Sequence, residues 1–234
     1  MVIRFLVLIL YCLCYLGVSS QNKYSIFGVI DNRIDTNQSK NGPLKNGNFI
    51  YLEIGEGTID SAVIDDDKFV FEGTLGISEV ASISYAYGGL AVLLSASDTS
   101  RYDCRFTLTS QETNIYGYDS EVTTDSHFHN SWLEYGSRAD ALNKKRTELQ
   151  TLTSEFSNDG LVAEVQVVNQ SLDILYSMIM KDDSLLPVEK AYILMGDPNF
   201  SKDKYLSFYQ QFSEDEKDAS IGRWFKKKLE STSP

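Results

Sequence analysis

The sequence predicts an α+β fold, in which an antiparallel β-sandwich or barrel-like N-terminal domain is followed by an α-helical segment. Up to about Thr124, short runs of apolar, β-branched and aromatic residues are separated by polar turns, which is typical of strands. After about Ser126, hydrophobic residues recur every three or four positions, which is typical of helices. With 234 residues, the chain is long enough to bury a core of its own. We expect a signal peptide at 1–20, a β domain at 21–125 and the α-helical segment at 126–234.

The first twenty residues have the layout of a secretory signal peptide. A basic start that ends at Arg4 is followed by an uninterrupted apolar run, Phe5–Leu16. Val18 and Ser20 then fit the −3 and −1 positions of a cleavage site before Gln21. As a helix, the apolar run would rise only ~18 Å, which is short of a ~30 Å hydrocarbon core. We therefore expect cleavage near Ser20, and no stable membrane insertion once the signal is removed.

The cysteines of the leader do not predict a lipoprotein. Cys12 and Cys14 follow the bulky residues Tyr11 and Leu13, whereas lipoprotein processing requires a small residue at that position. We expect an exported protein of the periplasm or cell envelope that is not a lipoprotein. Cleavage would leave Cys104 as the single cysteine, so that no intramolecular disulfide could form in an oxidising compartment.

The N-terminal part contains eight expected strands. Phe69 and Phe71 alternate with Lys68, Val70 and Glu72, which is the period of a half-buried strand. A short acidic connection, Asp65 to Asp67, precedes this strand and predicts a hairpin. The expected strands are Tyr24–Ile30, Asn48–Ile54, Thr58–Ile64, Lys68–Gly73, Glu79–Tyr87, Leu90–Ser95, Tyr102–Leu108 and Thr113–Tyr118.

Five helices are expected in the C-terminal part. Their ends follow the usual preference for proline at the first position, glycine after the last, and Ser with Glu three residues later as a capping box. In chain order they comprise a stripe over Trp132–Phe156 ended by Asn158–Gly160, a stripe over Val165–Ile179, a helix over Pro187–Gly196, a helix capped by Ser201, and a helix with Ser213 and Glu216 as its capping box.

The charge balance excludes two classes of partner. The chain carries 33 Asp and Glu against 21 Lys and Arg, a net charge of −12, and no Lys/Arg-rich stripe offsets it. Such a surface repels phosphate backbones and anionic lipid, so we expect no nucleic acid partner and no binding to membrane surfaces. The sequence also lacks a P-loop, a nucleophile elbow and a dinucleotide-binding fingerprint, and we expect no cofactor.

His127 and His129 are the only histidines and, with Asp125, the candidate metal ligands. On a strand, residues two apart face the same way, so both imidazoles and the carboxylate could hold one metal ion. The alternative is a polar surface turn that leads into the first helix, with Asp125, Ser126 or Asn130 as its cap. A triad of Ser126, His127 and Asp125 is disfavoured, because adjacent residues of a strand point to opposite sides. We favour the turn and expect no metal site.

Cys104 is expected to be a packing residue. On a strand it shares a face with Phe106 and Leu108, while Arg105 points away. A cysteine buried among apolar groups is generally inert, and the alternative is a resolving or mixed-disulfide role.

Three further segments have both a structural and a functional interpretation. Asp31–Asn37 and Asp65–Asp67 do not match the ligand spacing of a calcium loop. Lys226–Lys228, which lie beside aromatic residues, could dock a partner or membrane. A position on the solvent side of the last helix explains these lysines better. Tyrosines such as those in Tyr85–Tyr87 could line a binding surface, and half-buried strand positions explain them equally well.

Several motifs occur in an order that resembles a known family. The motifs are Ile26–Ile30, Tyr51–Leu52, Ile59–Val63 and Lys68–Gly73 in the strands, and Ala191–Leu194, Tyr205–Phe212 and Ser220–Gly222 in the helices. Together they resemble the N-terminal domain of unknown function that precedes thioredoxin-like domains in thiol–disulfide interchange (AhpC/TSA-type) envelope proteins of Bacteroidota. The resemblance covers most of residues 24–230 and implies a small β domain with a helical connector. It implies no redox activity, because the thioredoxin-like domain and its C-x-x-C motif are missing from this sequence.

We expect from these features a non-catalytic envelope protein that acts as a binding or interaction module for a protein or a small envelope ligand. One alternative is an accessory protein that docks thiol–disulfide oxidoreductases through its helical part. A second alternative is a hydrolase with an unrecognised site near His127 and His129.

Overall fold

The computed structural model describes residues 22–32, 44–85, 88–112, 115–156 and 158–232. Within these ranges eight strands precede six helices, which confirms an α+β fold with a strand-rich N-terminal part. The strands are β1 (Asn22–Asp31), β2 (Phe49–Ile54), β3 (Gly57–Val63), β4 (Lys68–Leu75), β5 (Glu79–Tyr85), β6 (Gly88–Leu94), β7 (Ser100–Glu112) and β8 (Ile115–Thr124). The helices are α2 (His127–Glu155), α3 (Asp159–Met180), α4 (Pro187–Leu194), α5 (Lys202–Tyr209), α6 (Glu214–Asp218) and α7 (Ser220–Ser231).

Some expectations concern residues outside this description. They are the signal peptide with Cys12 and Cys14, most of the segment Asp31–Asn37, the end of the expected strand Glu79–Tyr87 and the start of the expected strand Thr113–Tyr118.

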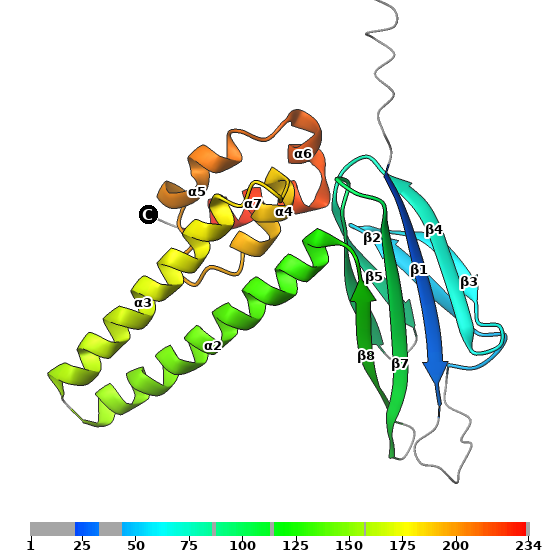
Figure 1. Ribbon diagram of the computed structural model, residues 1–234, viewed down its shortest axis with the longest axis horizontal. Helices are drawn as coiled ribbons and strands as arrows, with labels where there is room; N and C mark the ends of the chain where they lie inside the picture. Colours follow the sequence, from blue (N-terminus) through cyan, green and yellow to red (C-terminus); the bar gives the residue numbers. More distant parts are fainter. Residues whose placement is uncertain (1–21, 33–43, 86–87, 113–114, 157, 233–234) are drawn as a thin grey trace, which may run out of the picture.

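The strands form two four-stranded sheets with the orders β4-β1-β7-β8 and β3-β2-β5-β6 (Figure 1). Alternate residues of both sheets point into one shared core, among them Ile26, Phe71, Phe106, Leu52 and Ile83. All neighbouring strands are antiparallel except β1 and β7, which run parallel. This pair departs from the antiparallel arrangement that the sequence predicts, while the sheets as a whole keep it. Parallel strands require a long connection, and here the connection contains five other strands.

The acidic turn between β3 and β4 is present, but it does not close a hairpin. Asp66 and Asp67 both have positive φ, 48° and 58°, as in the tight turns that usually join paired strands. One bridge, Asp65 to Lys68, joins the two segments. Beyond it β3 pairs with β2 in one sheet and β4 pairs with β1 in the other. The turn is thus a corner between sheets, because each strand finds its apolar neighbours in a different layer.

Helices α2 and α3 form a long hairpin that projects away from the sheets (Figure 1). Of the shorter helices, α4, α6 and α7 lie toward the strands, and α5 packs against α7 farther from them. Ser126 caps α2, since its side chain accepts from the His129 N–H. Asn158 caps α3 by accepting from the Gly160 N–H at 2.8 Å. The segment expected only to end the first helix therefore also begins the second.

The expected fifth helix is two helices. The capping box of Ser213 and Glu216 starts α6, as expected, but Ala219 is extended with ψ of 156° and α7 begins after it. The chain turns sharply here because Gly222 lies against the end of α6. A Cβ atom on Gly222 would lie 1.9 Å from the carbonyl oxygen of Glu216, so no larger residue fits this close approach.

A buried carboxylate joins the sheets to the helices. Glu189 on α4 is 1% exposed, and its Oε1 accepts from the hydroxyls of Ser78 and Ser95 at 2.6 and 2.7 Å. Its Oε2 accepts from the Leu186 N–H at 2.9 Å, at the start of the same helix. The position of α4 relative to the strands is therefore fixed by hydrogen bonds to a charged group, which are among the stronger ones in proteins.

Candidate functional site

The two histidines lie in the first turn of helix α2, which Ser126 caps, as the favoured interpretation predicts. The alternative, in which they share one face of a strand, is wrong. On a helix, residues two apart are rotated by about 200° around the axis. His129 is buried, and its Nδ1 accepts from the Leu93 N–H at 3.2 Å. His127 is exposed, and Asp125 accepts instead from the Arg101 N–H at 2.8 Å. The three candidate metal ligands do not converge on one point.

His127 belongs to a chain of polar contacts whose order differs from that of a catalytic triad. The Ser184 hydroxyl donates to Asp182, so its oxygen is left to accept from the Nε2 of His127, 2.6 Å away. A triad requires the reverse, because its histidine takes the proton of the serine. Asp182 also accepts from the Tyr135 hydroxyl at 3.0 Å. The chain of contacts thus ties the loop between α3 and α4 to the start of α2.

His129 covers the free edge of a sheet. β6 is an outer strand, and Leu93 on it would otherwise present unpaired backbone groups to the helices. The imidazole accepts from its N–H, and the Tyr102 hydroxyl donates to its carbonyl at 2.7 Å. Burial lowers the pKa of His129 to about 4, from an ordinary value of 6.5. The ring is therefore neutral at pH 7 and acts in packing.

The structure confirms that Cys104 packs in the core. Cys104, Phe106 and Leu108 are all at most 2% exposed, while Arg105 points to solvent. Burial raises the pKa of the Cys104 thiol to about 12. Since the thiolate is the reactive form, this thiol is both shielded and protonated at pH 7.

We expect Cys104 to react with a soluble disulfide reagent at least about 100-fold more slowly in the folded protein than in the chain unfolded in denaturant. The absorbance of the released thiolate measures the rate, and a Cys104→Ala variant supplies the background. Equal rates in the two states would contradict the packing role.

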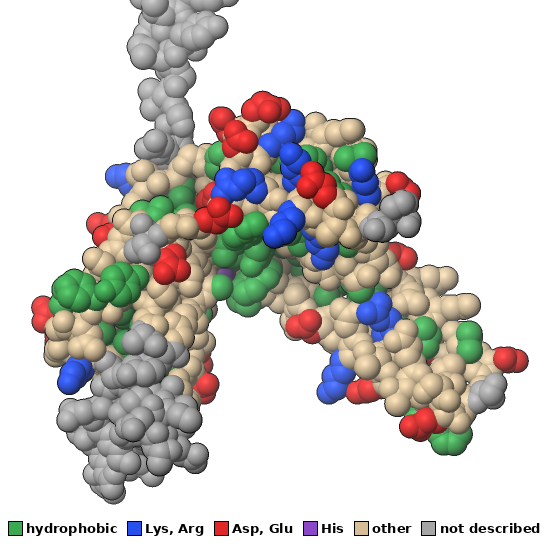
Figure 2. Space-filling model, turned by 180° about the vertical axis from the view of Figure 1, so that it is seen from behind, with side chains coloured by type: hydrophobic (Ala, Val, Ile, Leu, Met, Phe, Trp, Pro, Cys, Tyr) green, Lys and Arg blue, Asp and Glu red, His purple; other side chains and the backbone are tan. Residues whose placement is uncertain are grey.

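The basic segment at the end of the chain is partly structural. Lys228 donates to the carbonyl of Met195 and lies 4.8 Å from the centre of the Phe200 ring. Lys226 and Lys227 are exposed on the solvent side of α7, as expected. Figure 2 shows Lys and Arg side chains gathered with acidic ones over the short helices, above a hydrophobic patch at the junction with the strands.

Tyr85 is also explained by the fold. Its ring packs edge-on against Phe106 and Tyr118, with centroid distances of 5.7 and 5.8 Å. These contacts place Tyr85 against the core between the sheets. This agrees with its interpretation as a half-buried strand position.

A groove between α2 and α4, to which α3 contributes Tyr176, is a concave site in the described part of the chain. Its volume is about 780 Å³, within the range of small-molecule binding sites. We call it the α2–α4 groove. It is lined by Trp132, Leu133, Tyr135, Gly136, Ser137, Ala139, Asp140, Asn143, Tyr176, Tyr192, Ile193, Met195 and Gly196.

One end of the α2–α4 groove is aromatic. The rings of Trp132 and Tyr192 lie 6.4 Å apart with their planes at 52°, one on each wall. Phe128 and His129 support them from behind, with ring centroids 6.2 Å from Tyr192 and 5.5 Å from Trp132. Both supporting residues are buried, so this aromatic corner is held in place before any ligand arrives.

The other end of the groove is polar. Asp140 and Asn143 are neighbours on one face of α2, and the buried Oδ1 of Asn143 has no hydrogen-bond partner. Opposite them, the Tyr176 hydroxyl donates to the Gly196 carbonyl at 2.8 Å. Burial is the main reason why the pKa of Tyr176 is raised to about 12. Nearby carboxylates, Asp140 among them, act in the same direction, and Arg146 opposes them. Negative charge therefore acts at this end.

Gly136 forms the middle of the groove. A glycine inside a helix costs up to about 1 kcal/mol relative to alanine. Packing does not require it here, because a Cβ atom at this position would meet no other atom within 4 Å. The missing side chain leaves the groove open between its aromatic and its polar end.

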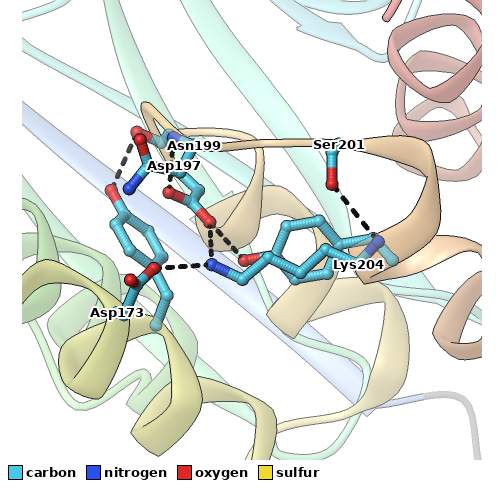
Figure 3. A network of polar contacts seen from close by, with 8 residues as sticks. Asp173, Asp197, Asn199, Ser201 and Lys204 are labelled. Atoms are coloured by element: carbon cyan, nitrogen blue, oxygen red, sulfur yellow. Dashed lines mark hydrogen bonds and ion pairs between the residues drawn. The ribbon is translucent and has the colours of Figure 1, made fainter. Parts of the chain in front are cut away.

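A polar network braces the wall at the polar end (Figure 3). The carboxylate of Asp197 is fully buried and accepts from the Lys204 ammonium at 2.8 Å and from the Tyr205 hydroxyl at 2.5 Å. Asp173 on α3 accepts from the same ammonium at 3.1 Å. The backbone of Asn199 also donates to Asp197, at 2.8 Å. The chain after α4 is thereby anchored to α3, which fixes the groove residues that precede it.

Sequence reasoning missed the α2–α4 groove, because it took Trp132, Tyr135 and Ala139 for part of a buried stripe. The signal that could have found it is the interruption of this stripe by Gly136, Asp140 and Asn143, at helical spacing on the same face. Partners from α3 and α4 were beyond the reach of such local patterns.

No family model, curated protein or solved structure matches this chain. The resemblance to the Bacteroidota envelope family therefore stays a prediction. Among the described residues, no helix combines the length and the apolar character needed to cross a membrane.

Proposed function

We propose that this protein is an exported, non-catalytic binding module of the cell envelope, and that its ligand lies in the α2–α4 groove. The open position at Gly136 carries the proposal. This glycine destabilises the helix, and packing does not require it. A side chain at this position would fill the groove.

The side chains that line the groove can bind a ligand through stacking and hydrogen bonds. They offer aromatic rings for stacking and a carboxylate, a carboxamide and hydroxyls for hydrogen bonds. Export rests on the sequence of residues 1–20.

Filling the groove should abolish binding without unfolding the protein. We expect Gly136→Leu to reduce at least about fivefold the fluorescence enhancement of N-phenyl-1-naphthylamine, a neutral aromatic probe that brightens in apolar sites. Because leucine favours helices over glycine, the melting temperature should stay the same or rise.

The matched control is Ala141→Leu, which adds similar bulk to the exposed side of the same helix and should leave the probe signal unchanged. The proposal fails if Gly136→Leu and the wild-type protein enhance the probe equally.

A further inference from the structure

We infer that the α2–α4 groove selects an arylalkylamine, a small ligand that carries an aromatic or flat apolar body and a primary ammonium group a few bonds away. This inference rests on the proposed function and names the chemical class of its ligand.

The aromatic end of the groove accounts for the flat body. Trp132 and Tyr192 meet at 52°, and Leu133 and Met195 add apolar surface beside them. A flat ring over Gly136 would touch these side chains and remove apolar surface from water on both sides. Gly136 lies four residues from Trp132 and four from Asp140, so each end is about 6 Å away along the helix axis.

The polar end accounts for the ammonium. At this end the carboxylate of Asp140 is the charged acceptor that the lining offers, and Asn143 adds a carboxamide. A primary ammonium has three donors and no acceptor, so it can pair with this carboxylate. Aromatic faces beside a cation add further attraction.

The charges around the groove favour a cation over an anion. Asp140 is the one charged residue in the lining described above, and no lysine, arginine or histidine belongs to that lining. Arg138 lies behind the wall, 6.0 Å from the Tyr135 ring, and pairs with Glu134. Arg146 lies one turn past Asn143 and opposes the effect of Asp140 on Tyr176, so its charge works against this preference.

Three indole compounds that share a two-carbon linker and differ in its terminal group test the inference. They are tryptamine with an ammonium, tryptophol with a hydroxyl and indole-3-propionate with a carboxylate. We expect isothermal titration at pH 7 to show that tryptamine binds about tenfold more tightly than tryptophol, with indole-3-propionate weakest. Asp140→Asn should remove most of this preference, while Glu148→Gln, which neutralises an exposed acid on the same helix outside the groove, should retain it.

The outcomes separate the two proposals. Tryptamine binding that is lost in Gly136→Leu and loses its charge preference in Asp140→Asn supports both. Equal or tighter binding of tryptophol or indole-3-propionate, or no binding of any probe, overturns the inference about the amine. Tryptamine binding that persists in Gly136→Leu places the amine elsewhere, and overturns the inference together with the role of the groove.

Discussion

Replacing Glu189 with alanine is expected to lower the free energy of unfolding by about 3 kcal/mol, because three buried donors lose a charged acceptor at once. The donors are the hydroxyls of Ser78 and Ser95 and the backbone N–H of Leu186. The first two belong to the strand-rich part and the third to the start of α4. The variant therefore loosens the contact between sheets and helices as well as the helix itself.

Denaturant titration followed by circular dichroism measures this effect. The free energy of unfolding of Glu189→Gln should lie between that of the wild-type protein and that of Glu189→Ala. The carboxamide oxygen still accepts from the serines, while its NH2 group faces the Leu186 N–H. Glu148→Ala removes an exposed glutamate and should change stability by less than about 0.5 kcal/mol. A loss below about 1 kcal/mol for Glu189→Ala would contradict the proposed role of the carboxylate.

Acid is expected to destabilise the fold through His129. Its pKa is about 4 in the folded protein and 6.5 ordinarily, so between these values the unfolded chain binds the additional proton. Stability therefore falls as the pH falls through this window, by at most about 3 kcal/mol. The structural reason is that protonation of Nδ1 would remove the acceptor for the Leu93 N–H and place a charge in the core.

The difference between variants isolates this contribution from that of other groups. Glu79 has the opposite effect on stability. Burial raises its pKa, so the free-energy cost of burying its charge falls as the pH falls. This contribution is the same in every variant. His129→Asn keeps an acceptor near the position of Nδ1, and should lower stability at pH 7.5 yet flatten its decline between pH 6.5 and 4. His127→Asn, two residues earlier and exposed, should retain the decline. Parallel pH profiles for wild type and His129→Asn would show that another group is responsible.

Local patterns were sufficient for most of the elements. The alternation of Cys104, Phe106 and Leu108 correctly predicted the inner face of β7, and Pro187 and Ser201 correctly marked the starts of two helices. These signals work because a strand repeats every two residues and a helix every 3.6, so the residues that decide them are close in the sequence.

The same locality explains what the sequence left open and where it was wrong. His127 and His129 are compatible with a strand and with a helix start, and the cap at Ser126 confirms the favoured turn into the helix. The turn at Asp65–Asp67 was correctly expected to be tight, but its strands join separate sheets, which depends on partners about 15 to 40 residues away.

The sequence by itself determined the α+β class, the order of strands before helices, most helix caps and the burial of Cys104. Only the tertiary structure decided the parallel pairing of β1 with β7, the buried position of Glu189, and the α2–α4 groove. The physical reason is that a groove exists only where side chains from separate helices leave space between them. Trp132, Asp140 and Tyr192 acquire their common role from packing between α2 and α4, and no pattern within either helix specifies that packing.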